Sequence, residues 1–377
     1  MSSIASPAAV IDDGAGAATL SPIEQALDLA RWAPSGDNSQ PWRFQVLGHD
    51  RAVVHAFDTR RHCVYDLEGH ASQVSVGAML ETLRIAASAQ GRAVEVVRRS
   101  EAPDEFPIFD VQLRPSGSAV PDPLHAVIRT RSVQRRPFSR QPLDVAAKAR
   151  LEAAVSPGYR VAWFEGAQRR RMAWLAFRSA HIRLTIPEAY AVHRAIIEWD
   201  ARFSADRVPD QALGADALTV KSMRWAMGSW ERVQRMNRWF GGTLAPRLQL
   251  ELVPGLRCAA HFAIFAPRPS AGIDDHLAAG AAVQRFWLTA TALGLQLQPQ
   301  YTPLVFADYA RRGVAFTEDA SAQRTAHAVD AMLAARLGSA ARAAVFMGRV
   351  GHGPAPEARS LRLTLDRLRW TGSIGPG

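Results

Sequence analysis

A short polar turn lies between residues 30 and 44, which read ARWAPSGDNSQPWRF. Its prolines and glycine force the chain to turn between a helical pattern and an expected strand. Three hydrogen-bonding side chains and several unpaired backbone N–H groups meet there: Ser35, Asn38 and Gln40. Such a turn beside a helix end suits a flat ligand with polar edges. The alternative is an ordinary helix–strand connection capped by its own serine and asparagine, and the residue types alone favour this simpler interpretation.

Two arginine-rich segments could bind an anion. Residues 129–138 read RTRSVQRRPF, and residues 343–362 read AAVFMGRVGHGPAPEARSLR. A guanidinium group pairs with phosphate through two parallel donors and keeps its charge. The alternatives are a basic helix start on the surface and a basic tail.

The turn resembles the FMN-contacting loop of the nitroreductase superfamily through residues 33–44, APSGDNSQPWRF. By this resemblance the residues that touch the isoalloxazine ring or ribityl chain would be Pro34, Ser35, Gly36 and Asn38, and Gln40 would hold the loop. Residues 129–138 resemble the Arg-rich opening motif of the same superfamily. This implies that Arg131 binds the FMN phosphate and that Arg135 reaches the pyrimidine edge of the ring. The register is open by one residue, so that either Ser132 or Val133 takes the place of the family serine.

Two further segments are interpreted through the same resemblance. Members of the superfamily end with basic residues that close over the phosphate, a role that fits Arg359 and Arg362 and, less well, Arg349. Residues 295–302, LQLQPQYT, occupy the place where the family offers a backbone N–H to flavin N5. The usual glycine-rich sequence is replaced there by Gln298, Pro299, Gln300 and Tyr301. This implies altered access or redox tuning, although the residues could equally form a plain strand.

An internal repeat indicates a duplicated domain. Residues 75–91, SVGAMLETLRIAASAQG, align without gaps on residues 278–294, AAGAAVQRFWLTATALG. Gly77 then meets Gly280, and Gly91 meets Gly294. Both segments carry apolar residues on nearly every turn and end at a glycine, as a buried, capped helix does. The alternative is that any two buried helices look alike.

The motif order supports the duplication. In single-domain nitroreductases the Arg motif precedes the Pro-Ser-Asn loop, and two chains pair because each FMN takes residues from both. Here the loop comes first, so we expect two nitroreductase-like halves fused as an intramolecular pseudo-dimer, with one complete FMN site between them. The expected organisation is a disordered leader (1–20), a first half (21–120) and a second half (121–377) with a Trp-rich helical insertion near 200–255, where Trp225, Trp230, Trp239 and Phe240 could form a lid.

Periodicity predicts an α+β fold, with a mostly antiparallel sheet flanked by helices in each half. We expect helices over residues 22–32, the two repeat segments and 168–199, and another that begins near residue 143. Strands are expected over residues 42–47, 53–57, 93–97, 108–113, 159–164, 258–265 and 343–349. Residues 115–123, PSGSAVPDP, are typical of a linker.

Composition narrows the function classes. No apolar run approaches the roughly 18 residues of a membrane span, and the only cysteines, Cys63 and Cys258, form no CxxC pair. These features predict a cytoplasmic protein without a membrane partner. The net charge of +10 is almost all arginine but scattered, so we expect no nucleic-acid partner. The histidines show no metal-ligand spacing, and no metal site is predicted.

The sequence therefore predicts an FMN-dependent oxidoreductase, monomeric or homodimeric. Electrons would pass from NAD(P)H, a transient visitor, through the flavin to a small organic substrate by a ping-pong route. No catalytic acid or base is evident. A flavin-sequestering or storage protein without turnover is one alternative, and a specialised biosynthetic flavoenzyme is another.

Overall fold

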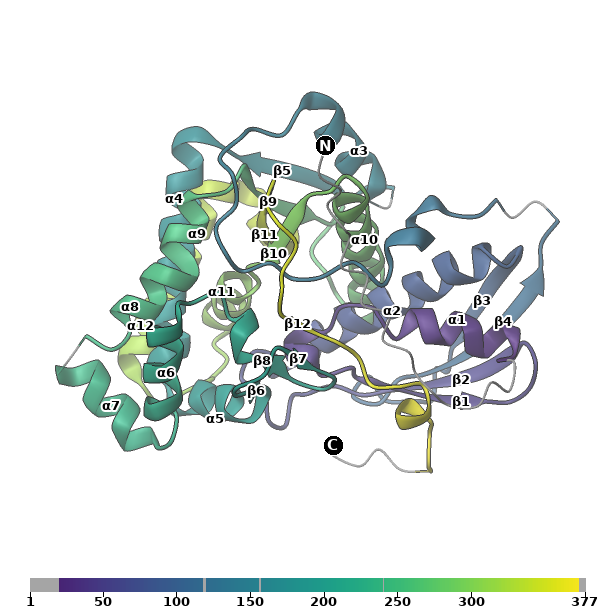
Figure 1. Cartoon of the computed structure of the whole chain (residues 1–377), viewed down its shortest axis with the longest axis horizontal. Helices are drawn as coiled ribbons and strands as arrows, with labels where there is room; N and C mark the ends of the chain where they lie inside the picture. Colours follow the sequence, from purple (N-terminus) through teal and green to yellow (C-terminus); the bar gives the residue numbers. More distant parts are fainter. Residues whose placement is uncertain (1–19, 118–119, 156, 240, 373–377) are drawn as a thin grey trace, which may run out of the picture.

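The computed structural model describes residues 20–117, 120–155, 157–239 and 241–372, which form two α+β halves lying side by side (Figure 1). Each half contains a four-stranded sheet whose neighbouring strands are all antiparallel. The first, in the order β1-β2-β4-β3, comprises β1 (Trp42–Val46), β2 (Arg51–Ala56), β3 (Arg92–Arg98) and β4 (Ile108–Pro115). The second, in the order β10-β11-β9-β5, comprises β5 (Arg160–Phe164), β9 (Ala260–Phe265), β10 (Gln296–Pro299) and β11 (Ala344–Gly351). The predicted α+β class is confirmed; the expected leader lies outside the described residues apart from Leu20.

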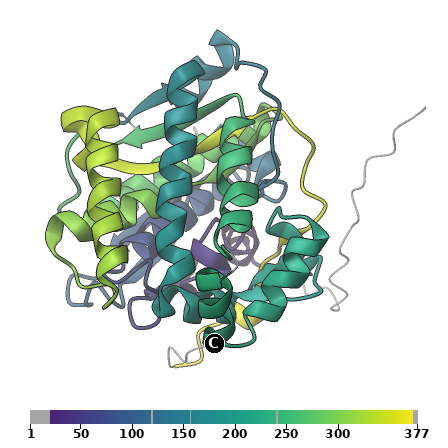
Figure 2. The same ribbon diagram turned by 90° about the vertical axis from the view of Figure 1, so that its left-hand side faces the viewer.

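Helices flank both sheets, and two short parallel strand pairs lie outside them. The helices are α1 (Pro22–Ala30), α2 (His70–Ser88), α3 (Val145–Ala154), α4 (Gly166–Thr185), α5 (Pro187–Ile196), α6 (Ala217–Ala226), α7 (Trp230–Trp239), α8 (Leu244–Arg247), α9 (Val253–Leu256), α10 (Ile273–Ala292), α11 (Thr302–Arg312) and α12 (Ala320–Leu337). The short strands are β6 (Ile197–Glu198), β7 (Phe203–Ser204), β8 (Val208–Pro209) and β12 (Arg359–Ser360), and they pair as β6 with β8 and β7 with β12. Figure 2 shows α4 and α12 side by side on the outer face of the second half.

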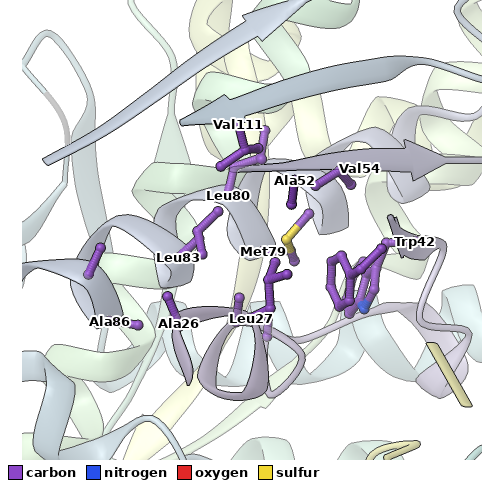
Figure 3. Packing of buried hydrophobic residues seen from close by; sticks show 14 of the residues in the cluster. Ala26, Leu27, Trp42, Ala52, Val54, Met79, Leu80, Leu83, Ala86 and Val111 are labelled. Carbon is purple, nitrogen blue, oxygen red and sulfur yellow. The ribbon is translucent and has the colours of Figure 1, made fainter. Parts of the chain in front are cut away.

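Helix α1 illustrates how local sequence becomes a core element. Ser21 and Glu24 form a capping box, and Pro22 takes the first helical position, where it costs no hydrogen bond. Apolar residues at helical spacing, among them Ile23 and Leu27, are fully buried. Figure 3 shows this face packed with side chains of α2 and of strands β2 and β4 in the core of the first half.

One predicted helix is interrupted. The expected helix over residues 168–199 is two helices, α4 and α5, with extended backbone at Ile186 between them. Pro187 explains the break, because its ring disfavours helical backbone in the residue before it. Among the described residues, no helix is both long and apolar enough to cross a membrane.

The two repeat helices cross at their aligned glycines. A Cβ added to Gly280 would lie 2.0 Å from the carbonyl oxygen of Val74, and one added to Gly77 would lie 2.1 Å from that of Leu277. The backbones of α2 and α10 are thus in direct contact. Nearby, the buried Gln284 amide donates to Thr82 Oγ1 at 2.8 Å. The contact between the halves therefore requires glycine at both positions.

The C-terminal segment leaves the second half and packs onto the first (Figure 1). After β12 it contributes the buried side chains of Leu363, Leu365 and Leu368 to the core of the first half. The backbone N–H of Trp370 donates to the carbonyl of Phe44 at 2.9 Å. The first half therefore depends on a segment of the second for part of its packing.

Candidate functional site

A cavity of about 1410 Å³ lies where the halves meet. Its wall includes five segments that are far apart in the sequence: the loop 34–40, residues 131–135, residues 298–303, the C-terminal segment 359–363 and helices α6 and α7. The thirteen main candidates from the sequence line this cavity, whereas the weaker candidate, Arg349, does not. Arg349 is fully buried, and its guanidinium donates to the Gln298 side chain and to the carbonyls of Arg135 and Arg136. The structure thus brings the candidate segments, which are far apart in the sequence, into one cavity.

The loop after α1 has an unusual backbone. Asp37, Asn38 and Gln40 all have positive φ angles, of 51°, 64° and 46°. Left-handed backbone at a residue other than glycine is disfavoured and concentrates at functional sites. Ser35 Oγ accepts the backbone N–H of Gln40 at 3.0 Å, which closes the turn. The loop is therefore held in a costly shape that exposes its polar groups to the cavity.

Side chains of the same loop tie it to the second half. The Asn38 amide donates to the carbonyls of Ala205 and Arg207, both at 3.2 Å. The fully buried Gln40 amide donates to the Ala205 carbonyl at 2.9 Å and accepts the backbone N–H of Leu363 at 2.9 Å. Gln40 thus connects the loop to both the insertion and the C-terminal segment.

Replacing Gln40 by alanine is expected to destabilise the protein by about 1–3 kcal/mol, because the buried N–H of Leu363 loses its acceptor and the carbonyls of Asn38 and Ala205 lose the donor that Gln40 supplies. Urea unfolding measures the effect. The matched control is Gln25→Ala, which removes an exposed glutamine that donates to the Leu20 carbonyl and should change stability by no more than about 0.5 kcal/mol. Equal stability of the two variants would show that Gln40 does not hold the loop.

Three arginines converge on one side of the cavity: Arg131, Arg359 and Arg362. Arg131 is 3% exposed and Arg362 is 9% exposed. Within the described chain, none of the three forms a salt bridge with a carboxylate; their hydrogen bonds go to main-chain carbonyls, including those of Trp32 and Ala33. The Nε groups of Arg131 and Arg359 are buried and have no partner among those residues.

The electrostatics of this cluster favour an anionic ligand. Burial, together with the charges of Arg362 and Arg359, lowers the pKa of Arg131 well below its usual range. Burial and the charges of Arg359 and Arg31 lower the pKa of Arg362 to about 9. A buried charge that lacks a counter-ion is costly. A phosphate would offset that cost and occupy the unused guanidinium donors.

Arg135 lies on a different side of the cavity. Its Nη1 donates to the carbonyl of Ala212 at 3.1 Å. Burial lowers the pKa of Arg135, while the nearby Asp37 raises it. Ser132 and Val133 both line the cavity beside it, so the one-residue choice of register stays open.

The segment that includes Pro299, Gln300 and Tyr301 forms the end of β10 and the start of α11. The Gln300 side chain lies 2.9 Å from His261 Nδ1, and the second atom of its amide is buried without a partner in the described part of the chain. Burial raises the pKa of Tyr301, so it stays neutral. These residues line the cavity with hydrogen-bonding groups but with no flexible glycine.

Helices α6 and α7 line the cavity with methionines and not with the expected tryptophans. Met223, Met227 and Met236 line it, whereas Trp225 and Trp239 are 53% and 71% exposed. The expectation that tryptophans face the site is wrong: Trp225 and Trp239 are turned to the surface, and Trp230 packs against Tyr190, with ring centroids 5.4 Å apart. Phe240 lies outside the described residues. Methionine is flexible and polarizable, which suits a surface that adapts to different ligands.

Other lining residues gave no signal in the sequence. The Tyr65 hydroxyl lies 2.9 Å from His193 Nε2, and Arg183 pairs with Glu251 at 2.7 Å. Burial and the charge of Arg183 lower the pKa of His193 to about 3, so its ring is neutral. The two residues of the first pair are 128 positions apart in the sequence, and those of the second pair are 68 apart. A local sequence motif cannot indicate contacts over such separations.

A group of three possible metal ligands lies outside this cavity: Glu68, His70 and Asp308. Arg312 forms salt bridges with both carboxylates. The arginine already supplies the positive charge that a cation would bring, so this arrangement is an ion-pair network.

Comparison with known proteins gives a match for part of the chain. Residues 19–73, which include the loop, match the Nitroreductase family. The uncharacterized proteins MT3212 and Rv3127 from two strains of Mycobacterium tuberculosis are each 36% identical to the chain over 89 residues. These matches cover 22% of the chain and 26% of each relative, so the chain spans about a quarter of the length of these relatives.

Two solved structures resemble the chain over larger shares. One is the nitroreductase-like family protein from Bacillus cereus, with 13% identity, a TM-score of 0.33, and coverage of 67% of this chain and 98% of that one. The other is the FMN-dependent nitroreductase NfnB from Mycobacterium smegmatis in complex with NADPH. It has 18% identity, a TM-score of 0.34, and coverage of 66% of this chain and 96% of that one.

Proposed function

We propose that the chain binds FMN and is an oxidoreductase of the nitroreductase type. The observation that carries this proposal is the cluster of Arg131, Arg359 and Arg362, which lacks a carboxylate partner within the described residues and lies in the same cavity as the loop 34–40. Such a cavity fits a ligand with a phosphate at one end and a flat polar ring at the other. The match of residues 19–73 to the Nitroreductase family supports the same ligand.

The residues present fit FMN. The three arginines would bind its phosphate through charge-assisted hydrogen bonds. Ser35, Asn38 and the backbone of the loop would contact the ring and the ribityl chain, with Arg135 near the pyrimidine edge. When bound, FMN supplies two-electron redox chemistry. The protein orients it, shields it from water under α6 and α7, and leaves a methionine-lined space for NAD(P)H and a small organic substrate in turn.

We further propose that the chain is a pseudo-dimer of two nitroreductase-like halves, residues 21–120 and 121–377. The loop comes from the first half and the arginines come from the second. The repeat helices cross at the glycines that the repeat alignment pairs. One flavin site per chain follows, in a monomer or in each subunit of a homodimer.

The purified protein is expected to be yellow, or to become so on titration with FMN. Under argon, an excess of NADPH should then bleach the flavin absorbance, because hydride transfer reduces it. Absorbance spectroscopy measures both steps. A colourless protein that does not respond to FMN would contradict the proposal.

A flavin-sequestering protein is the second candidate, favoured by the cover that α6 and α7 place over the cavity and by the absence of glycine at residues 298–301. The same experiment separates the two. Flavin that stays oxidised in NADPH and in NADH, yet is fully bound, would support sequestration.

A further inference from the structure

We propose that Asp37 is the proton donor to the substrate in the reaction proposed above, on which this inference rests. The loop that carries Asp37 also carries the residues proposed to hold the flavin. Asp37 lines the same cavity as Ser35, Asn38 and Gln40. Its backbone is left-handed, with φ 51° and ψ 23°, inside the short 3₁₀ turn Gly36–Asn38. A strained backbone at this position is consistent with a functional constraint on its side chain.

Asp37 differs from every other acidic residue of the cavity wall because it has no fixed partner. Five other acidic side chains line the cavity, and each forms a hydrogen bond or salt bridge with a neighbour: Asp58 with Arg60, Asp66 with Thr59 and Ser72, Glu105 with Arg61, Asp206 with Arg207, and Glu251 with Arg183. Asp37 forms neither with any described residue. Its carboxyl group is therefore available to a ligand.

The groups around Asp37 suit an acid that gives up a proton and recovers it. Burial raises the pKa of Asp37, and the charges of Arg135 and Arg183 act in the opposite direction. Cys63 and Tyr65 are also close enough to feel its charge. Desolvation thus keeps the carboxyl protonated to a higher pH than an ordinary aspartate. Once the proton has left, the two arginines stabilise the carboxylate.

Three other titratable groups of the cavity, those of Tyr65, His193 and Cys63, are weaker acids. Burial raises the pKa of Tyr65, and its neighbour His193 is neutral, with its pKa lowered to about 3. Burial also raises the pKa of Cys63 to about 12. None of the three can release a proton near neutral pH as readily as Asp37.

Reduction of a quinone shows which proton Asp37 would supply. A quinone that becomes a hydroquinone gains a hydride, which the reduced flavin cofactor supplies, and one proton. That proton moves from an oxygen of Asp37 to the quinone oxygen, where the new O–H bond forms. The Asp37 carboxylate then takes a proton from water after the product leaves.

Stopped-flow oxidation of the reduced holoprotein by two different oxidants tests whether Asp37 donates the proton. 1,4-Benzoquinone needs a proton with its electrons, whereas ferricyanide takes electrons alone. Asp37→Asn is expected to slow oxidation by benzoquinone on the order of 100-fold and to change the rate with ferricyanide by less than about threefold. Asp37→Glu, which restores a carboxyl, should recover part of the rate. In the wild-type protein, the rate of oxidation by benzoquinone should fall as the pH rises through the pKa of Asp37. In Asp37→Asn, the same rate should show no such fall.

A second measurement does not depend on turnover. NMR titration of carboxyl-¹³C-aspartate in the oxidised holoprotein should contain a signal with a raised pKa that is lost in Asp37→Asn, whereas the signal of Asp66, whose pKa burial also raises, should remain. Equal slowing with both acceptors, no slowing with either, or an ordinary pKa for Asp37 would each overturn the assignment. A protein that binds no FMN, or that NAD(P)H does not reduce, would instead refute the proposed function before this test is reached.

Discussion

The variant Arg131→Ala is expected to bind FMN roughly 10- to 150-fold more weakly than the wild type. A hydrogen bond to a charged group contributes about 1.5–3 kcal/mol, and about 1.4 kcal/mol corresponds to a tenfold change in affinity. Arg131 is almost fully buried, its Nε has no partner among the described residues, and its guanidinium lies 4.6 Å from the ring centroid of Trp287. Its position is therefore fixed, and the free donor is available for the phosphate. Fluorescence titration with FMN at low protein concentration measures the loss.

Arg136→Ala is the matched control for Arg131→Ala. It removes the same charge from the same segment, but Arg136 is exposed and does not line the cavity. Its affinity for FMN should stay within about twofold of wild type, the size of a screened long-range effect. If both variants lose affinity equally, net charge and not a direct contact is the cause. If neither does, the phosphate does not bind at Arg131.

The variant Gly280→Ala is expected to lower the free energy of unfolding by about 3 kcal/mol, the upper end of the usual cost of overpacking. The added Cβ would lie 2.0 Å from a carbonyl oxygen and 2.7 Å from the backbone nitrogen of Ala78. These are main-chain atoms of α2, which cannot rotate away, so the two helices must separate. The expected sign is the opposite of the usual one. In a helix that is not packed against a neighbour, replacing glycine by alanine raises the free energy of unfolding by about 1 kcal/mol.

Chemical denaturation measures this effect, with Ala278→Val as the control. Ala278 lies on the same helix α10 but is exposed, so added bulk there should change stability by no more than about 0.5 kcal/mol. Gly77→Ala should behave like Gly280→Ala, because the two glycines meet at one crossing. Wild-type stability of Gly280→Ala would show that α2 and α10 do not pack backbone to backbone.

Local sequence determined much of the secondary structure. The strands expected near residues 42–47, 93–97, 108–113 and 159–164 correspond to β1, β3, β4 and β5 with shifts of no more than two residues. The repeat segments are α2 and α10, although each helix begins about five residues earlier than expected. Periodicity and capping act between neighbours in the chain, so the sequence reports them directly.

The sequence also located the polar segments of the cavity, because proline, glycine and arginine have strong local preferences. It does not indicate Asp37 or the buried pairs that complete the wall. Asp37 stands out because it has no hydrogen-bond or salt-bridge partner among the described residues, a property that no sequence pattern reports. Tyr65 and His193 meet only after α5 folds against the segment before α2.

The tertiary structure alone decided which residues share one cavity. The Leu363 N–H reaches Gln40 across 323 positions of sequence, and Arg362 reaches the Ala33 carbonyl across 329. It also turned methionines rather than tryptophans of α6 and α7 toward the site. The physical reason is that side-chain burial and electrostatic pairing depend on separation in space, whereas the patterns in a sequence record only separation along the chain.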